Sequence, residues 1–116
     1  MANVLKSFGK KVSTSATIDG VAMFQDTILT SGSGKTCTIV GINFANLTNA
    51  TINVHCFVLK NTGSVTTHLI GKPTQIVSGS ALFFPNKHVL ESQDAIKVVC
   101  DTDDAVDVFI SYLEQS

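Results

Sequence analysis

The sequence has no arginine and no tryptophan, and it is poor in charge. Among its 116 residues are eight lysines, charged residues make up 15%, and the net charge is −1, whereas roughly 25% of a typical soluble domain is charged. Without arginine the chain lacks the bidentate donor that serves phosphate and guanine recognition best. We therefore expect no direct nucleic-acid partner. The surface must be built largely from Ser, Thr and Asn, which can be buried against a partner at low cost.

Long apolar runs are missing too. No stretch of about 18 apolar residues occurs. Residues 1–11 do not resemble a secretory signal, because Lys10 and Lys11 follow the apolar residues instead of preceding them. We therefore expect no membrane partner and reduced cysteines. The sequons at Asn46 and Asn49 are interpreted as a polar turn, since glycosylation requires a secretory context.

Catalytic and cofactor motifs are also missing. Residues 32–36 match only the end of a phosphate-binding loop: Leu29 stands where a glycine is needed, and strand-like sequence follows, so we predict a hairpin loop. His55, His68 and His88 lack ligand spacing, and there is no Cys-x-x-Cys pair and no Gly-x-Ser-x-Gly elbow. We therefore expect no enzyme, no metal and no cofactor. A metal site assembled only by the fold is the open alternative.

The acidic residues cluster in one place. Asp101, Asp103, Asp104 and Asp107 lie close together, and aspartate favours turns because its side chain bonds nearby amides. We predict that residues 101–104 form an exposed hairpin turn that makes the strands on either side antiparallel neighbours. The alternative is an ion site, although the segment lacks the glycine and distal glutamate of an EF-hand loop.

What the sequence does contain is alternation with a period of two. Ile42 and Phe44 alternate with Gly41 and Asn43, and several other runs rich in β-branched residues alternate in the same way. We predict one all-β domain over residues 1–116, an antiparallel β-sandwich of the jelly-roll or immunoglobulin-like type. The predicted strands are 2–12, 16–29 (broken near Asp19-Gly20), 36–46, 51–60, 65–72, 75–84, 95–100 and 105–114. Turn-forming clusters lie at 31–34, 46–50, 61–64, 78–80, 85–87, 91–94 and 101–104.

Parity within these runs predicts both a core and a possible interface. Even-numbered residues, Val40 among them, form the predicted core face, yet several odd-numbered residues are apolar as well. Either both faces are covered within the domain or bulges shift the register, or the odd face is an apolar patch that docks on another subunit. The residues of the predicted interface are Ile39, Phe57, Leu59, Val99, Phe109 and Leu113.

The cysteines follow the same parity. Cys56 and Cys100 fall in the core register and are expected to behave as small buried hydrophobes. Cys37 falls in the other register beside a loop. It is therefore the predicted accessible thiol and the candidate for a bond between subunits.

The order of motifs resembles small virion structural proteins of tailed bacteriophages. Residues 73–82, 87–91, 94–98 and 106–114 carry the resemblance, and the opening residues 1–7 are similar too. The resemblance implies a non-enzymatic β-sandwich of the virion, made in the host cytoplasm, that decorates the capsid or forms part of the neck or tail. Its partners would be major capsid, portal, neck or tail proteins, and the protein would be a homo-oligomer or present in many copies.

One residue departs from that family's pattern, and one alternative function stays open. Gln93 stands where these proteins usually have glycine before Asp94, so the turn there is expected to differ. The alternative is a receptor- or carbohydrate-binding module of a tail or fibre. Such sites stack sugars on exposed aromatic rings, whereas this chain has no Trp and a single Tyr, Tyr112, at a core-register position.

Overall fold

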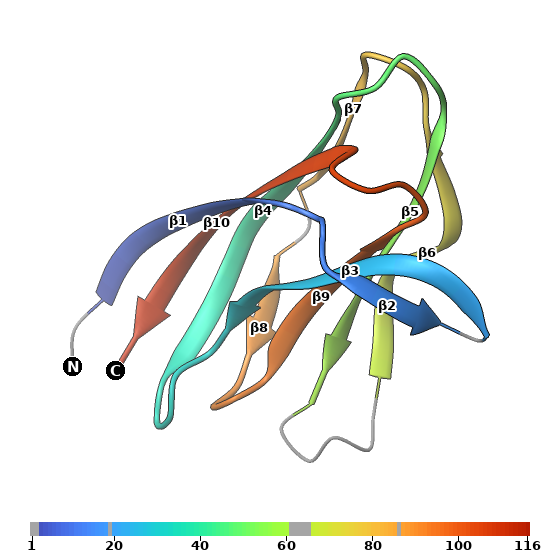
Figure 1. Ribbon diagram of the computed structural model, residues 1–116. Coiled ribbons are helices and arrows are strands. Elements are labelled where there is room, and N and C mark those ends of the chain that lie inside the picture. The colour runs from blue at the N-terminus through green and yellow to red at the C-terminus, as the bar shows by residue number, and fades with distance from the viewer. Residues whose placement is uncertain (1–2, 19, 61–65, 86) are drawn as a thin grey trace.

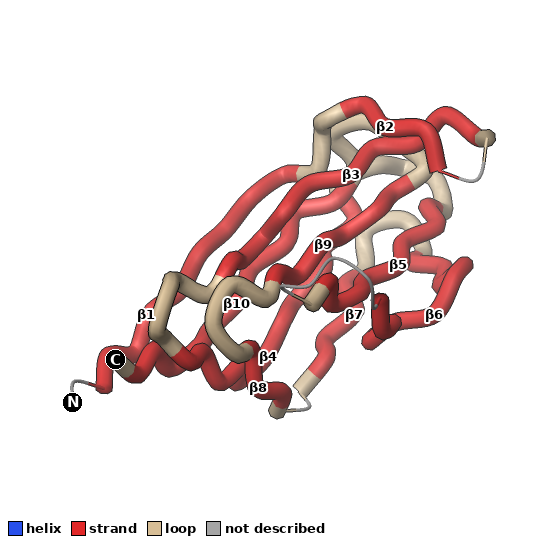
Figure 2. Tube along the Cα trace, turned by 90° about the horizontal axis from the view of Figure 1, so that it is seen from below, coloured by secondary structure: helices blue, strands red, loops and turns tan. Residues whose placement is uncertain are grey.

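The alternation of apolar and polar residues produces strands along almost the whole chain. The computed structural model describes residues 3–18, 20–60, 66–85 and 87–116, which form strands and loops (Figure 2). In that part of the chain no helix is long and apolar enough to cross a membrane. The strands are β1 (Asn3–Lys11), β2 (Ser15–Ile18), β3 (Val21–Thr30), β4 (Thr36–Asn46), β5 (Ile52–Leu59), β6 (Thr66–Ile76), β7 (Ala81–Phe84), β8 (His88–Leu90), β9 (Ala95–Cys100) and β10 (Val106–Gln115).

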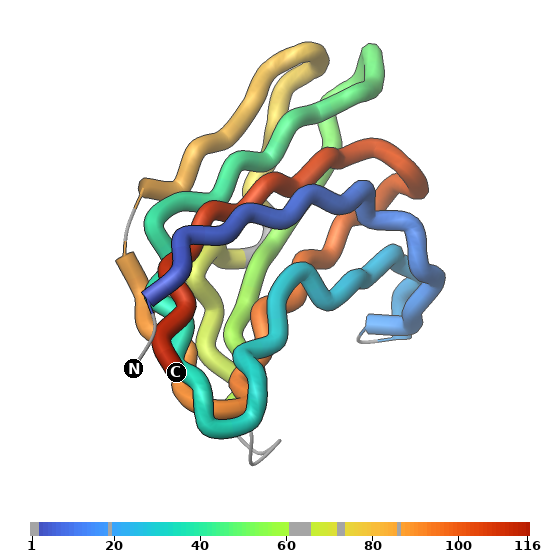
Figure 3. Tube along the Cα trace, turned by 90° about the vertical axis from the view of Figure 1, so that its left-hand side faces the viewer, coloured from blue at the N-terminus to red at the C-terminus, as the bar shows by residue number. Residues whose placement is uncertain are grey.

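Two antiparallel sheets, which we name sheet A and sheet B, pack face to face as a β-sandwich (Figures 1 and 3). Sheet A has the strand order β1-β10-β4-β7, and β8 also pairs with β4. Sheet B has the order β2-β3-β9-β5-β6. Because Asn3 lies opposite Gln115 in the pairing of β1 with β10, the two ends of the chain lie side by side (Figure 1).

The order of pairing identifies the type of sandwich. Strands early in the chain pair with strands late in the chain in reverse order: β1 with β10, β3 with β9, β4 with β7, and β5 with β6. The chain is thus one long antiparallel hairpin. Further pairing of β10 with β4 and of β9 with β5 closes it into two sheets. The predicted antiparallel β-sandwich is confirmed, and its connectivity is that of a jelly roll.

The core lies between the sheets and follows the predicted even register on most strands. Val54 and Cys56 of β5, Val98 of β9 and Ile110 of β10 are fully buried, and each large aliphatic side chain contributes about 1.5–3 kcal/mol on burial. The largest fully buried side chains are Phe44, Ile39, Ile42, Ile52, Leu90, Ile96 and Ile110.

Strand β4 departs from the predicted register through a β-bulge. Gly41 lies opposite Ser111, but Ile39 lies opposite the next residue of β10, Tyr112, so Val40 is an extra residue. A bulge of this kind reverses the side-chain alternation beyond it. Ile39 is 0% exposed and Val40 is 43% exposed. The prediction that Val40 faces the core and Ile39 faces outward is therefore wrong, and the bulge explanation holds on this strand.

Two predicted strand boundaries are also wrong. Residues 75–84 do not form one strand, because β6 ends at Ile76 and a turn follows, in which the Ser80 amide donates to the Val77 carbonyl at 3.0 Å. Gly79 in this turn has a φ of 69°, which glycine adopts at no steric cost. Strand β8 was not predicted, since three residues are too few to show alternation. The turn predicted at 61–64 lies outside the described residues.

Two predicted hairpin loops connect the sheets instead of neighbouring strands. Residues 101–105 lead from β9 in sheet B to β10 in sheet A, and residues 31–35 lead from β3 in sheet B to β4 in sheet A. Asp101 accepts hydrogen bonds from the Asn53 backbone amide (3.1 Å) and Nδ2 (2.8 Å). The prediction that β9 and β10 are antiparallel neighbours is wrong, although Asp104 does adopt the left-handed backbone (φ 53°) that aspartate tolerates.

The predicted polar turn after β4 is confirmed, and one buried amide holds it. Nδ2 of Asn46 donates to the carbonyl oxygens of Ala50 (2.8 Å) and Ile76 (2.9 Å). Its Oδ1 accepts from the backbone amide and the hydroxyl of Thr48, both at 2.8 Å. The full hydrogen-bonding capacity of this amide is thereby used within the fold.

Candidate docking surface

The side chains of sheet A that face away from the core form one continuous surface, which we name the outer face of sheet A. Antiparallel partners point to the same side of a sheet, so the strand register places Gly9, Phe109, Asn43 and Phe83 in one row across β1, β10, β4 and β7. The full set is Asn3, Leu5, Ser7, Gly9, Lys11, Thr36, Thr38, Val40, Gly41, Asn43, Ala45, Ala81, Phe83, Val89, Asp107, Phe109, Ser111, Leu113 and Gln115.

Two aromatic rings on this face lie against glycines of the neighbouring strands. A Cβ atom on Gly9 would meet Cδ1 of Phe109 at 3.2 Å, and one on Gly41 would meet Cε1 and Cζ of Phe83 at 3.1 Å. A ring that covers a glycine on the adjacent strand shields its backbone and keeps the ring close to the sheet. Phe83 is nevertheless 61% exposed and Phe109 is half exposed. The rings therefore add exposed apolar surface to this face.

A shallow hollow interrupts the face at the edge strand. Its volume is about 330 Å³, and it is lined by Leu5, Lys6, Ser7, Val40 and Ser111. Leu5 is 76% exposed. The ammonium of Lys6 lies 2.9 Å from Glu114, and this hydrogen bond raises the pKa of Lys6. The one cation at the hollow is thus paired within its own chain, and the remaining lining is neutral.

Charge is confined to one end of the outer face. Lys11 lies opposite Asp107 at that end, and none of the other residues that define the face is charged. Exposed apolar patches of this kind on a folded domain mark interaction sites, since a monomer otherwise places polar side chains there. The arrangement can bury apolar area against another protein surface.

The opposite surface, the outer face of sheet B, is closed by its own side chains. The rings of His55, Phe57 and His68 form a triangle with centroid distances of 5.4 Å from His68 to each of the other two and 6.1 Å between His55 and Phe57. Val99 lies directly opposite His55 and is only 1% exposed. His55 itself is buried, although its odd number places it outside the predicted core register.

The structure separates the six residues of the predicted interface into three groups. Phe109 and Leu113 lie on the outer face of sheet A. Phe57 and Leu59 lie on that of sheet B and are half-buried, whereas Ile39 and Val99 are buried in the chain and have no surface to offer a partner. Sequence reasoning missed Leu5, Val40, Phe83 and Val89. Alternation along residues 3–11 contained a signal for Leu5, but β7 and β8 are too short to show one.

The cysteines offer no accessible thiol. Cys37, Cys56 and Cys100 are all free and fully buried. The prediction that Cys37 is accessible is wrong, because its side chain shares the core with Ile39 beyond the β-bulge. Burial raises the pKa of Cys56 to about 12 and also raises the pKa of Cys100. These two thiols therefore stay protonated and unreactive near neutral pH.

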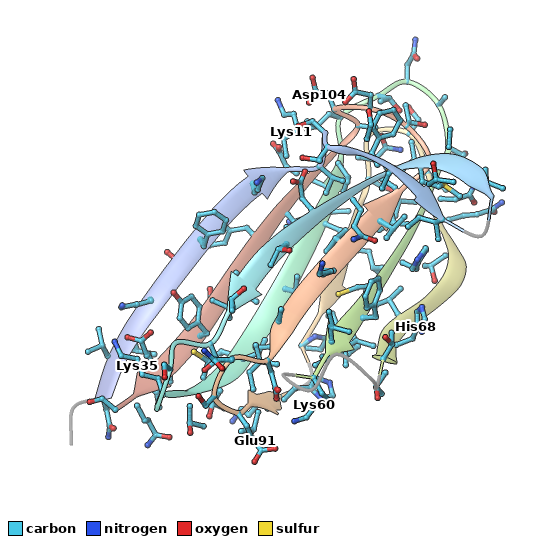
Figure 4. The ribbon with its side chains drawn as sticks, turned by 60° about the horizontal axis from the view of Figure 1, so that its bottom comes forward. Lys11, Lys35, Lys60, His68, Glu91 and Asp104 are labelled. Atoms are coloured by element: carbon cyan, nitrogen blue, oxygen red, sulfur yellow. The ribbon has the colours of Figure 1, made fainter. Side chains whose placement is uncertain are left out.

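Charged residues gather where the loops meet at one end of the sandwich. Figure 4 places Lys35, Lys60 and Glu91 at that end and Lys11 and Asp104 at the other. Nζ of Lys60 lies 2.9 Å from Glu91 and 2.5 Å from Asp94, whose carboxylate is almost fully buried and also accepts the Glu91 amide at 3.0 Å. This cluster ties the loops together. Across residues 3–18, 20–60, 66–85 and 87–116, no group of three or more His, Cys, Asp or Glu could hold a metal ion.

Neither a protein-family model nor a curated protein matches the sequence. Among solved structures, the chain is similar to one in the structure of infectious bursal disease virus Gx strain, with a TM-score of 0.53 and 10% identity over 96% of this chain and 32% of that chain. A chain of the T13 particle of the same virus gives a TM-score of 0.53 and 10% identity over 97% of this chain and 30% of that one. The protein thus spans about a third of these viral chains, and the likeness shows a common fold.

A family 35 carbohydrate binding module from Clostridium thermocellum is a more distant likeness. Its TM-score is 0.32 with 15% identity, over 97% of this chain and 89% of that chain. A score this low does not show a common fold.

Proposed function

We propose that the protein is a non-enzymatic structural subunit of a virion, and that it docks onto another virion protein through the outer face of sheet A. The observation that carries the proposal is that face itself: it is rich in exposed apolar side chains and uncharged except at one end, with Phe83 and Phe109 lying against Gly41 and Gly9. A face of this kind suits a flat, neutral protein surface better than nucleic acid or a membrane, both of which would favour a cluster of positive charge.

Two further observations support a virion over other assemblies. Chains of the infectious bursal disease virus structures have the same fold, and the sequence resembles small virion proteins of tailed bacteriophages. A capsid-decoration or neck-collar subunit in many copies follows from combining this resemblance with the docking face. Many copies on one particle would strengthen a modest contact by multivalency.

The test is binding to particles that carry this chain. Virions stripped of the protein are incubated with purified chain, and bound protein is measured by co-sedimentation. We expect the double variant Phe83→Ser/Phe109→Ser to bind at least about tenfold more weakly than the unaltered chain, because two central apolar anchors are lost. The matched control is Val21→Ser/Val77→Ser, two exposed apolar residues outside the face, which should bind like the unaltered chain.

Three outcomes contradict the proposal. Equal loss in both double variants would show that the contact is not specific to sheet A. Failure of the unaltered chain to bind any stripped particle would remove the virion role. Saturable binding to a glycan array would favour the receptor- or carbohydrate-binding alternative.

A further inference from the structure

The two sheets have several edge strands, and β1 differs from the rest. Strands β2 and β7 have four residues and β8 has three, while the pairing of β6 with β5 is interrupted by register shifts. Strand β1 has nine residues, all exposed, and pairs with β10 without a register shift. Figure 1 shows no strand beyond it at the margin of sheet A. Short and bulged edges resist pairing with another chain, whereas a long regular edge permits it.

Lysine usually protects such an edge, but the lysines of β1 are held by their own chain. Lys6 forms an ion pair with Glu114 at 2.9 Å, and Lys10 forms one with Asp26 at 3.2 Å. Both acceptors belong to the sandwich itself, on β10 and β3. The ammonium groups of Lys6 and Lys10 are therefore directed toward the body of the protein. The third lysine, Lys11, is the last residue of the strand.

We propose that β1 is a self-pairing edge, which binds β1 of a second copy in antiparallel orientation across a two-fold axis and joins two copies of sheet A. Opposed residues must point to the same side of the joined sheet. Only registers that pair odd with odd and even with even residues meet this condition. Because β1 runs from Asn3 to Lys11, the register that pairs all of its residues places Ser7 opposite Ser7 of the second copy.

Charge selects this register over its neighbours. With Ser7 at the axis, Lys6 lies opposite Phe8, Lys10 opposite Val4, and Leu5 opposite Gly9, so no lysine opposes another. Moving the axis to Lys6 places two lysines face to face, and moving it to Phe8 places Lys6 opposite Lys10. Like charges directly opposite each other destabilise a strand pair. Full overlap and charge therefore favour the same arrangement.

The pairing also covers apolar surface that the single chain leaves exposed. Val4 and Phe8 of β1 are nearly half exposed, and in the favoured register each lies beside a lysine stem of the second copy, which can cover it. One strand pair is smaller than a standard protein interface. We therefore expect a weak dimer that is populated only at high protein concentration. This inference does not rest on the virion role, because it concerns the edge of sheet A and not its outer face.

The first test is a symmetric disulfide. Since the native cysteines are buried, Ser7→Cys adds an exposed thiol at the axis, where opposed Cβ atoms approach the spacing that a disulfide needs. Lys11→Cys is the matched control, because its two copies would lie at opposite ends of the pairing, about 27 Å apart. Under oxidised glutathione we expect a Ser7→Cys dimer at least about fivefold more abundant than a Lys11→Cys dimer. The double variant Asn3→Cys/Lys11→Cys should also cross-link.

The second test measures the monomer–dimer equilibrium in the absence of a cross-link. Val4→Lys would place a lysine opposite Lys10 twice, by symmetry, and should raise the dimer dissociation constant about tenfold in sedimentation. The control Leu47→Lys changes an equally exposed residue in a loop and should leave it unchanged. Equal cross-linking of Ser7→Cys and Lys11→Cys would overturn the register. A chain that sediments as a monomer up to about 1 mM, a concentration at which even weak contacts are populated, would overturn the self-pairing edge.

Discussion

The outer faces of the two sheets carry similar sequence patterns and behave in opposite ways. On sheet A, Phe83 and Phe109 have glycines beside them on the neighbouring strands, and the rings stay exposed. On sheet B, Phe57 has His55 and His68 beside it, and the three rings cover one another. An apolar residue in the odd register thus stays exposed or joins a closed cluster according to the side chains beside it.

The largest effect on stability should be found at the β-bulge of β4, where one residue faces the core and the next lies on the outer face of sheet A. Ile39→Ala should lower the free energy of unfolding by about 3 kcal/mol, because it removes a fully buried aliphatic side chain. Val40→Ala, one residue away, should change it by less than about 0.5 kcal/mol. Urea unfolding of both variants measures the difference. Similar losses at the two positions would mean that the register of β4 is not as described.

A second comparison sets the two outer faces against each other directly. Val99→Ala on sheet B should cost about 2 kcal/mol of stability, because Val99 is buried although it faces away from the core. Phe109→Ser on sheet A should cost less than about 1 kcal/mol and should weaken docking instead. Thermal melts of the two variants, together with particle binding, test this. If Phe109→Ser lost more stability than Val99→Ala, the outer face of sheet A would be needed for folding and not for docking.

A smaller effect on stability should come from Asp26, which connects β3 of sheet B to the end of β1 in sheet A and to the segment that follows it. Asp26 on β3 accepts hydrogen bonds from the Ser13 amide (2.8 Å) and the Thr14 hydroxyl (2.7 Å), and Lys10 lies 3.2 Å away. Burial alone would raise the pKa of Asp26, but these hydrogen bonds outweigh it and lower the pKa. The carboxylate therefore contributes stability above its unfolded pKa of about 3.9, and this contribution is lost as the pH falls through the lowered value.

Comparing Asp26→Asn with the unaltered chain across pH measures that contribution. The stability difference should be largest near pH 7 and should shrink as the pH falls below about 4. A stability difference that stays constant down to pH 2 would show that the charge of Asp26 does not contribute to the stability of the fold.

The smallest effect on stability concerns the loop that connects β8 of sheet A to β9 of sheet B. Gln93 has a φ of 66°, in the left-handed region that costs a non-glycine residue about 1 kcal/mol. The backbone amide of Gln93 donates to the Ser31 carbonyl at 2.9 Å, which holds this conformation. Gln93→Gly should therefore raise the free energy of unfolding by up to about 1 kcal/mol. A loss of stability in chemical denaturation would instead assign the Gln93 side chain a contact that outweighs the strain.

The sequence by itself determined the strands and the class of fold. Period-two alternation depends only on neighbours along the chain, so β4, β5, β9 and β10 were predicted within about two residues, which is the usual precision of an element boundary. The same alternation identified Cys56 and Cys100 as core residues and Phe109 and Leu113 as outward-facing.

Only the tertiary structure decided the strand pairing and which odd residues reach a surface. Strands β9 and β10 are close in sequence but belong to different sheets, because the long hairpin pairs early strands with late ones. The positions of Ile39 and Cys37 depend on one extra residue in β4, and the burial of Val99 depends on His55 across the sheet. These outcomes rest on contacts between residues far apart in the chain, which alternation along a single strand does not encode.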